Sequence, residues 1–441
     1  MEDTEPNNSA IARSATTKAS WRLLPLLGLA YLIAYMDRVN ISFAAAQMNA
    51  DLHFSATIYG LGGGLFFLSY SLFEVPSNVI MMCVGPRRWL ARIMISWGIL
   101  AAAMMLVRTP MQFYVLRFLI GMAEAGFFPC VVYYIAHWFP QAHRGRAISR
   151  FYLFGPLASV VMGVFSNFLL GMNGMLALRG WQWLLLIQGL PAVFVGIIIL
   201  CILPDAPATA RWLTDDEKAW LSREIDRDAA RIGEPESHSV MAALRDPLVV
   251  HLALISICTI APFYAFTLSA PQVLMAASGY DTQVIGYAVS LGGIVGATTM
   301  ALTGWLSDRR GDRFSFLLTA MVIESTALAI IAWAPSPVAV MLAYLLFAAA
   351  WTPVTLSQVM IWADVFHVRR LAICSAAINS VAQIGAFVSP YGFGMAKDAT
   401  GSYTAGMLAL PLVTMLGFVL AIPLMRKLNG GRVAVAVTCR P

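Results

Sequence analysis

Hydrophobic residues in this chain of 441 residues fall into long runs separated by short polar segments. Each run is long enough for a helix to cross the hydrocarbon core of a bilayer, which takes about 20 residues. Six runs precede a long polar stretch at 204–246, and six follow it. The predicted spans are 22–46, 57–82, 90–108, 111–138, 147–171, 181–203, 247–275, 283–306, 314–334, 338–363, 371–396 and 403–425. The pattern predicts an all-α membrane protein with twelve transmembrane helices.

Composition supports a lipid bilayer as the main partner of this chain. Hydrophobic residues make up 59% and charged residues only 12%, whereas soluble proteins carry about 25% charged residues. The net charge of +6 does not require a nucleic-acid partner, because cytoplasmic loops of membrane proteins are enriched in Lys and Arg. The cysteines are scattered singly, without metal-ligand spacing. We therefore expect no metal, cofactor or catalytic residue, and no enzymatic activity.

The short loops predict the orientation of the chain. Basic residues gather in the alternate loops that hold Arg87 and Arg88, Arg144 and Arg146, Arg309, Arg310 and Arg313, and Arg369 and Arg370. The loops between them hold little beyond Arg108, Arg179 and Lys397. The first set is expected in the cytoplasm, together with both termini and the 204–246 stretch. The polar first residues lack the basic start and short apolar run of a signal peptide.

An internal repeat relates the two groups of six spans. Gly85 begins a basic loop after the second span, and Gly311 lies in the matching loop 226 positions later. Arg144-Gly145-Arg146-Ala147 has its counterpart in Arg369-Arg370-Leu371-Ala372, with an offset of 225 positions. Duplicated halves with a site between them are typical of transporters. The predicted organisation is a tail at 1–20, a bundle at 21–203, a linker at 204–246, a second bundle at 247–426 and a tail at 427–441.

The linker carries the signature of a helix start. Thr214 is followed three residues later by Glu217, which predicts a capping box, and acids fill the first turn. We expect a short surface helix from about Asp215 to Arg231. Its alternating charges indicate a solvated face, so the segment is interpreted as a tether between the halves.

An arginine and a glutamate lie inside the 111–138 span. Arg117 and Glu124 are seven positions apart, so they share one helix face and lie roughly 10 Å apart along the axis. A charge at this depth costs at least about 3 kcal/mol and needs a partner or a wet cavity. The span is therefore the first candidate for a functional site.

The 22–46 span supplies a second pair, Asp37 and Arg38. It runs from the cytoplasm outward and the 111–138 span runs inward, which brings Arg38 and Arg117 to similar depth. Two guanidinium groups match a carboxylate well, and two acids balance their charge. If protons neutralise the acids, the arginines are free to bind an anion. The alternative is that the four charges form a buried brace between the two helices.

The loops and several motifs resemble the major facilitator superfamily, and within it the anion:cation symporter family, which includes permeases for tartrate, phthalate, sugar acids and hydroxyphenylacetate. The loop after the eighth span fits the superfamily signature in Gly304-Trp305-Leu306-Ser307-Asp308-Arg309-Arg310-Gly311-Asp312-Arg313. The closer family marks are Tyr35-Met36-Asp37-Arg38-Val39-Asn40-Ile41, Glu74-Val75-Pro76-Ser77-Asn78, Arg117 to Pro129, Trp138-Phe139-Pro140, Gly180-Trp181-Gln182-Trp183, Trp212 to Lys218, Ile378-Asn379-Ser380 and Thr400-Gly401-Ser402-Tyr403. His143 and the region around Ala350-Trp351-Thr352-Pro353 depart from the family pattern.

The resemblance implies proton-coupled symport of a small organic anion by alternating access. Arg38 and Arg117 would bind the carboxylate, and Asp37 and Glu124 would carry the protons as the coupling ion. Further substrate-binding candidates are Tyr35, Tyr70, Asn379, Gln383, Tyr264 and Gln358. Gating at the cytoplasmic ends of the helices is expected of Asp308, Arg309, Arg313, Arg144 and Arg146.

Other functions stay open at this point. A proton antiporter that exports organic acids or drugs uses the same architecture, and a membrane sensor that transports nothing is a third reading. We expect a monomer in a bacterial inner membrane. His251 is interpreted as an interfacial histidine and Glu324 receives no role. The glycine runs Gly62–Gly64 and Gly292-Gly293 predict close approach of helices.

Overall fold

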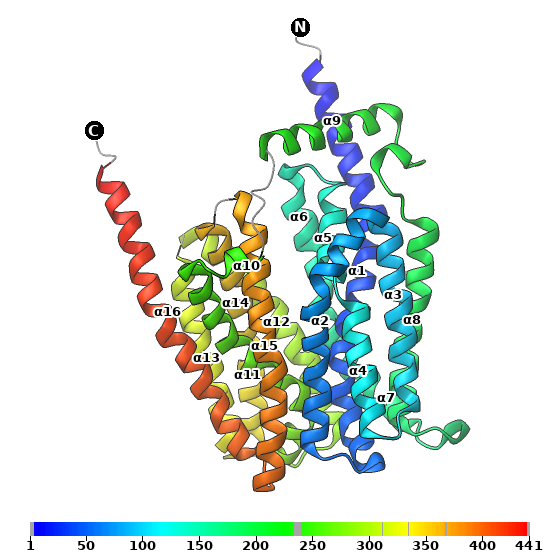
Figure 1. The fold of residues 1–441 in the computed structure, drawn as a ribbon, viewed down its shortest axis with the longest axis vertical. Coiled ribbons are helices and arrows are strands. Elements are labelled where there is room, and N and C mark those ends of the chain that lie inside the picture. Colours follow the sequence, from blue (N-terminus) through cyan, green and yellow to red (C-terminus); the bar gives the residue numbers. More distant parts are fainter. Residues whose placement is uncertain (1–3, 233–239, 311, 334, 367, 439–441) are drawn as a thin grey trace. The chain divides into compact units, whose positions relative to one another are not determined.

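The computed structural model describes residues 4–232, 240–310, 312–333, 335–366 and 368–438, and these form helices and the connections between them (Figure 1). The α-helices are α1 (Thr4–Leu52), α2 (Ala56–Val84), α3 (Pro86–Ala103), α4 (Pro110–Glu124), α5 (Phe127–Ala136), α6 (Gln141–Tyr152), α7 (Phe154–Gly171), α8 (Gly180–Ile202), α9 (Asp215–Ile232), α10 (Val240–Ala243), α11 (Pro247–Ser278), α12 (Thr282–Arg310), α13 (Arg313–Trp333), α14 (Pro337–Val365), α15 (Val368–Thr400) and α16 (Thr404–Thr438). Short 3₁₀ turns are η1 (Met104–Leu106), η2 (Met175–Ala177) and η3 (Pro207–Thr209).

Twelve helical segments in the described part of the chain are long and apolar enough to cross a membrane, which confirms the predicted number. Proline and polar caps explain several of their starts. A side chain caps the helix and proline holds the first helical position at Thr109-Pro110 of α4, Asp246-Pro247 of α11 and Ser336-Pro337 of α14. Proline suits this position because its missing N–H would have no helical partner there, and the cap accepts one of the free N–H groups.

Three predicted spans differ from the structure in their bounds or their continuity. α1 begins at Thr4, so helix continues well before residue 22. The predicted 111–138 span consists of α4 and α5, which are separated at Ala125 and Gly126. The 147–171 span is likewise divided between α6 and α7 at Leu153. Breaks of this kind arise from tertiary contacts, which the hydrophobic pattern does not record.

The described residues divide into two compact units. Unit 1 lies within Met1–Gln47 and Leu68–Pro235, and unit 2 lies within Met48–Phe67 and Glu236–Pro441. In unit 1, α3 packs against α8, α4 and α5, and α7 packs against α8. In unit 2, α11 packs against α15 and α16, while α13 packs against α14 and α16.

The first turns of α2 belong to unit 2, and small residues permit this packing. A Cβ atom on Gly60 would overlap the carbonyl oxygen of Pro390 in α15, and one on Gly64 would overlap the carbonyl oxygen of Phe387. Asp398 of α15 accepts hydrogen bonds from the backbone N–H groups of Ala56 and Thr57, at 3.0 and 2.8 Å. The predicted close approach at the 62–64 glycines is confirmed at Gly64.

Helix α9 begins at Asp215, as predicted, and its capping box is present. The Thr214 N–H donates to Glu217 Oε2 at 2.9 Å, and the Glu217 N–H donates to Thr214 Oγ1 at 3.4 Å. The prediction of a solvated tether is wrong for one face of the helix. Leu213, Glu217, Leu221 and Asp228 are all buried, at the spacing of one helical stripe.

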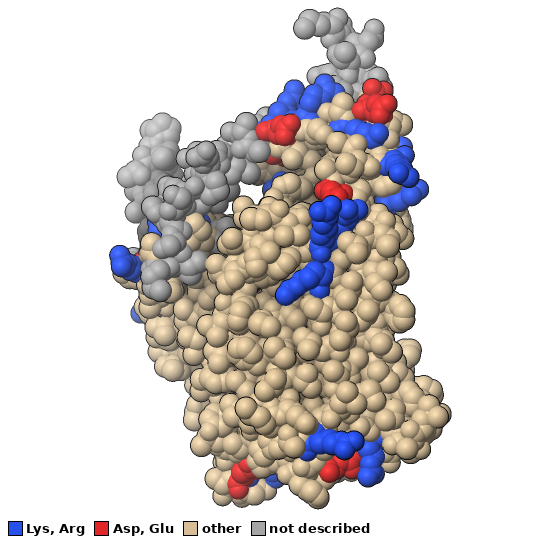
Figure 2. All heavy atoms as spheres, turned by 45° about the vertical axis from the view of Figure 1, so that its right-hand side comes forward, with Lys and Arg blue, Asp and Glu red and all other residues tan. Residues whose placement is uncertain are grey.

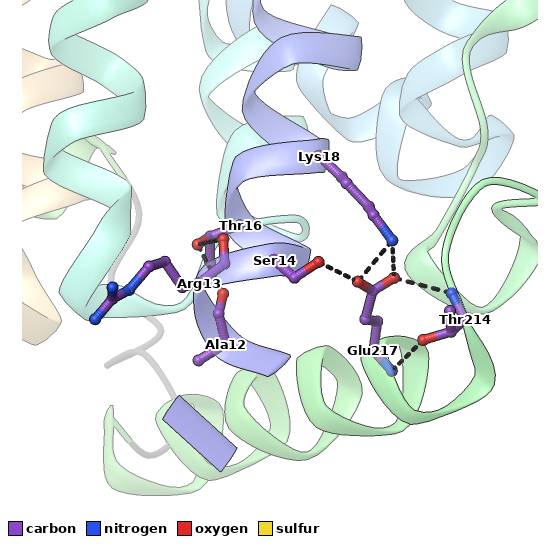
Figure 3. A network of polar contacts seen from close by, with 7 residues as sticks. All are labelled: Ala12, Arg13, Ser14, Thr16, Lys18, Thr214 and Glu217. Carbon is purple, nitrogen blue, oxygen red and sulfur yellow. Dashed lines mark hydrogen bonds and ion pairs between the residues drawn. The ribbon is translucent and has the colours of Figure 1, made fainter. Parts of the chain in front are cut away.

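Glu217 is the centre of the contact between α9 and the first turns of α1 (Figure 3). Lys18 Nζ lies 2.8 Å from Glu217 Oε1, and Ser14 Oγ donates to the same oxygen at 2.6 Å. Burial by itself raises the pKa of Glu217, but the hydrogen bonds from Lys18, Ser14 and the Thr214 N–H outweigh it and lower the pKa to about 2. The carboxylate stays charged and joins α9 to α1 within unit 1.

Two further contacts hold α9 and the segment before it against other helices of unit 1. The Trp212 ring stacks on Trp138 at a centroid distance of 5.6 Å. Asp228 Oδ2 accepts a hydrogen bond of 2.6 Å from the Gln141 N–H at the start of α6. A carboxylate is favourable at a helix N-terminus because it meets free N–H groups and the positive end of the helix dipole.

Figure 2 shows one face of the molecule, with charged side chains over its upper half and along its lower edge. Between them the surface in this view is a broad band without Lys, Arg, Asp or Glu. An uncharged band flanked by charges is what a bilayer requires of a membrane-spanning surface.

Candidate functional site

Two of the four predicted charges of unit 1, one from each helix, form a direct contact. Arg38 of α1 donates from Nε and from a terminal nitrogen to the single oxygen Oε1 of Glu124, at 2.8 and 2.6 Å. Glu124 is 0% exposed, while the Arg38 side chain is 25% exposed. The second carboxylate oxygen, Oε2, has no hydrogen-bond partner among the described residues. In this ion pair the Glu124 carboxylate is therefore buried, whereas the Arg38 side chain is partly exposed.

Asp37 lies next to Arg38 in sequence but has different partners. Its Oδ2 accepts a hydrogen bond of 2.9 Å from Trp97 Nε1 of α3, and its Oδ1 accepts one of 2.9 Å from Asn40 Nδ2. Asp37 is 4% exposed. Both oxygens are thus satisfied by neutral donors. Trp97 was not among the predicted site residues, because one tryptophan in an apolar span carries no signal of its partner.

Arg117 and Tyr70 complete the cluster. Arg117 is 3% exposed in α4, and its charge acts on both Asp37 and Glu124. Tyr70 of α2 is buried, and the Arg38 guanidinium carbon lies 5.2 Å from the centre of its ring. This is the geometry of a cation–π contact. The two cations and two acids give the cluster no net charge when all four are ionised.

Glu124 is held in place by a break in its own helix. It is the last residue of α4, and Gly126 follows with φ of 86°, a left-handed conformation that glycine adopts without steric cost. Pro129 has no N–H to offer the carbonyl oxygen of Ala125. Ser77 Oγ of α2 replaces that donor at 2.6 Å. The break was not predicted, although Gly126 and Pro129 were its signals.

Tyr35 of α1 packs within a group of aromatic side chains. It is half-buried and packs edge-on to Tyr31 at a centroid distance of 6.2 Å. Tyr31 in turn packs on Phe151 at 4.5 Å. The described ring contacts of Tyr35 therefore belong to an aromatic group at the α6–α7 junction, and its role in binding stays a prediction.

The predicted residues of the second half all lie in unit 2. Gln358 of α14 is buried, donating to Thr259 Oγ1 at 2.8 Å and accepting from Ser256 Oγ at 3.3 Å. Its amide therefore links α14 to α11. Tyr264 packs on the Phe67 ring at 4.1 Å.

Asn379 and Gln383 lie one turn apart on α15. Asn379 is half-buried, and Gln383 is 9% exposed. Gln383 Oε1 has no hydrogen-bond partner within the described residues. Gln383 Oε1 is therefore placed to accept a hydrogen bond, and the roles of Asn379 and Gln383 in binding stay predictions.

The predicted gating residues lie at helix ends and have different contacts. Arg313 Nε donates to Asp364 Oδ2 at 2.8 Å, which links the start of α13 to the end of α14. Arg309 lies over the Trp305 ring at 3.8 Å. Arg144 donates to the carbonyl oxygen of Ala136 at 3.1 Å. Arg146 is exposed, and the Asp308 side chain lies outside the described residues. The gating roles of these five residues stay predictions.

Comparison with known proteins shows to which family this chain belongs. Residues 27–390 match the Major Facilitator Superfamily. The chain belongs to this superfamily. A putative tartrate transporter of Agrobacterium vitis is 38% identical over 97% of this chain and 94% of its own length. A quinolone resistance transporter of Acinetobacter baumannii is 36% identical over 93% of this chain and 94% of its own.

The fold agrees with that of solved members of the superfamily. A bacterial homologue of the human lysosomal transporter Spinster has a TM-score of 0.72 at 18% identity, with 92% of this chain and 97% of the other covered. This major facilitator protein is thus a multi-pass membrane transporter and not an enzyme. The tartrate relatives are consistent with the resemblance to the anion:cation symporter family.

Proposed function

We propose that this transporter is a proton-coupled symporter of small organic carboxylates in a bacterial inner membrane. The observation that carries the proposal is the ion pair between Arg38 and Glu124. A cation that is partly exposed and an acid that is completely buried share one contact. An external carboxylate is able to replace Glu124 on the guanidinium if Glu124 loses its charge. The tartrate relatives support a carboxylate as the substrate.

The contacts of the two acids favour Glu124 as the group that takes up the proton. Asp37 is satisfied on both oxygens by Trp97 and Asn40, neither of which carries charge. Glu124 depends on Arg38, and its Oε2 is free among the described residues. A proton on Oε2 would neutralise Glu124 and release Arg38, while Arg117 adds a second positive charge at the site.

The steps of transport follow from this exchange. Protonation of Glu124 precedes or accompanies binding of the substrate carboxylate to Arg38, so the substrate and the proton occupy the site together. After the carrier opens to the other side, release of the substrate returns Arg38 to Glu124, and the proton leaves. Because a charged Glu124 and a bound anion compete for Arg38, the substrate binds only together with the proton.

Proteoliposomes with radiolabelled tartrate as the probe test the proposal. An acidic exterior is expected to drive accumulation by the wild type. Arg38→Gln should reduce uptake at least tenfold, and Glu124→Gln should abolish pH-driven accumulation while tartrate–tartrate exchange continues. Arg150→Ala, at an exposed arginine of α6, is the matched control. Uptake by Arg38→Gln at the wild-type rate would show that the ion pair is not the substrate site.

Export by proton antiport is the second candidate, because a quinolone resistance transporter is similar over nearly the whole chain. The same vesicles distinguish the two with a fluoroquinolone as the probe. Antiport requires that an acidic interior drive accumulation of the probe, whereas symport of an anion requires an acidic exterior. Accumulation of the fluoroquinolone alone, without movement of tartrate in either gradient, would favour export.

A further inference from the structure

One carboxyl group of unit 2 takes no part in the site described above. Glu324 is the twelfth residue of α13, which runs over Arg313–Trp333, so it lies roughly 16 Å from one end and 14 Å from the other. Its exposure is 0%. Its neighbours on the same stripe of α13, Ala320, Met321, Ala327 and Leu328, are buried and apolar. Glu324 therefore lies in the interior of unit 2, near the middle of its span.

Neither oxygen of this carboxyl has a hydrogen-bond partner among the described residues. The nearest hydroxyl in sequence, Ser325 Oγ, donates to the carbonyl oxygen of Pro411 on α16. Glu124 differs in this respect, because Arg38 contacts it. Glu324 has no described cation to stabilise a negative charge.

The titratable groups farther along the helices packed around α13 are Cys258 and Tyr264 of α11 and Tyr344 of α14. The charged groups and the histidine on these elements lie near helix ends. Asp364 of α14 pairs with Arg313, eleven residues before Glu324. His251 near the start of α11 lies 2.7 Å from the carbonyl oxygen of Leu420. The others on packed elements are Arg309 and Arg310 at the end of α12 and Arg426 near the end of the span of α16.

A negative charge in this position would be very unfavourable. Transferring an ionised carboxylate into an apolar interior without a partner costs so much that the group takes up a proton instead. A neutral acid with no acceptor for its O–H is still unfavourable there relative to an apolar residue. Leucine would fill the same space without that cost. An ionisable residue inside the membrane is for this reason a candidate functional group.

We propose that Glu324 is a second proton-binding site, located inside unit 2. It holds a proton while α13 is packed against α14 and α16, and it releases the proton only in an arrangement that lets water reach the carboxyl. The proton would thereby favour the packed arrangement, since a ligand shifts a protein toward the state that binds it better. This inference does not rest on carboxylate transport, because it requires neither Arg38 nor a particular substrate.

Infrared spectroscopy of the purified full-length protein in lipid tests the proposal, because a protonated carboxyl absorbs apart from carboxylates and amides. At neutral pH we expect one protonated-carboxyl band that is lost in Glu324→Gln and in Glu324→Leu and kept in Ser325→Ala. After overnight incubation in D₂O buffer this band should shift to lower frequency in the wild type. The amide band of each Glu324 variant serves as the control for misfolding. If it is unchanged, the variant retains its helices, and loss of the carboxyl band reports the missing carboxyl group.

Two results would overturn the proposal. If no protonated band disappears in either Glu324 variant, the group holds no proton in the folded protein. If the band disappears but does not shift in D₂O, the proton is sealed in and does not exchange. Failure of tartrate uptake by the wild type would refute the proposed function and leave this inference unaffected, so the two failures are distinguishable.

Discussion

Replacing Arg38 by methionine removes the only described hydrogen-bond donor to Glu124. Methionine keeps an unbranched side chain, shorter than that of arginine, and removes the charge. The carboxylate would then be buried with Arg117 as its remaining nearby cation. Replacing Glu124 by methionine instead leaves Arg38 without its acid, but the Arg38 side chain is 25% exposed and retains access to water. The two single substitutions should therefore differ in cost.

The expected magnitudes follow from burial. Removing one member of a buried ion pair costs about 3–5 kcal/mol, because the other charge is left uncompensated. Since Arg117 partly compensates Glu124, we expect about 3 kcal/mol for Arg38→Met and about 1–2 kcal/mol for Glu124→Met. In the double variant both charges are gone, and replacement of a buried pair by apolar residues of similar size is close to neutral. The coupling energy should thus be about 3 kcal/mol or more, a factor of at least about 100 in the unfolding equilibrium.

Unfolding of the purified protein by SDS in mixed micelles, followed by tryptophan fluorescence, measures the four free energies of this cycle. The control cycle combines Arg38→Met with Glu217→Gln. Glu217 contacts Lys18, twenty residues before Arg38 on the same helix, or roughly 30 Å away, so these effects should add. Additivity of Arg38→Met and Glu124→Met within about 0.5 kcal/mol would refute the reasoning, because the two side chains would then have no energetic interaction.

Three further predictions concern stability. Gly126→Ala should cost at least about 2 kcal/mol, because alanine is strained at φ of 86° and its Cβ would overlap Ser77 Oγ. Trp97→Phe should cost about 1.5–3 kcal/mol, because it removes one donor to the buried Asp37 carboxylate. Glu217→Gln should cost about 2 kcal/mol at pH 7, less than its full pKa shift implies because its partner Lys18 is 42% exposed. That difference should begin to decline as the pH falls below the unfolded pKa of 4.5 and should be lost only as the pH reaches the folded pKa of about 2.

Matched variants control these three predictions in the same unfolding assay. Gly85 also has a positive φ, but a Cβ there meets open space, so Gly85→Ala should cost less than Gly126→Ala. An Asp37→Asn substitution should cost less in the Trp97→Phe background than in the wild type. Asp215 is 99% exposed in its side chain, so Asp215→Asn should leave the pH dependence unchanged. Equal effects within any of these pairs would contradict the corresponding explanation.

Local patterns in the sequence were enough to predict the number of spans, the helix in the linker and the four charged residues inside the spans. The reason is that a bilayer constrains local composition directly. About 20 apolar residues are needed for each span, and a charge such as Arg117 or Glu124 is conspicuous inside one. The capping box at Thr214 and Glu217 is likewise complete within four residues, so no distant contact was needed to predict it.

Which acid pairs with which arginine depends on how the helices pack, and it could not be predicted from the sequence. Asp37 and Glu124 are both acids inside apolar spans, so the sequence does not distinguish them. In the structure Trp97 of another helix donates a hydrogen bond to Asp37, and Arg38 donates to Glu124. The break after Glu124 depends on Ser77 of α2, and the buried face of α9 depends on Lys18 and Ser14 of α1. Partners separated by dozens to hundreds of residues leave no local pattern, because each hydrogen bond exists only once packing has brought its donor and acceptor together.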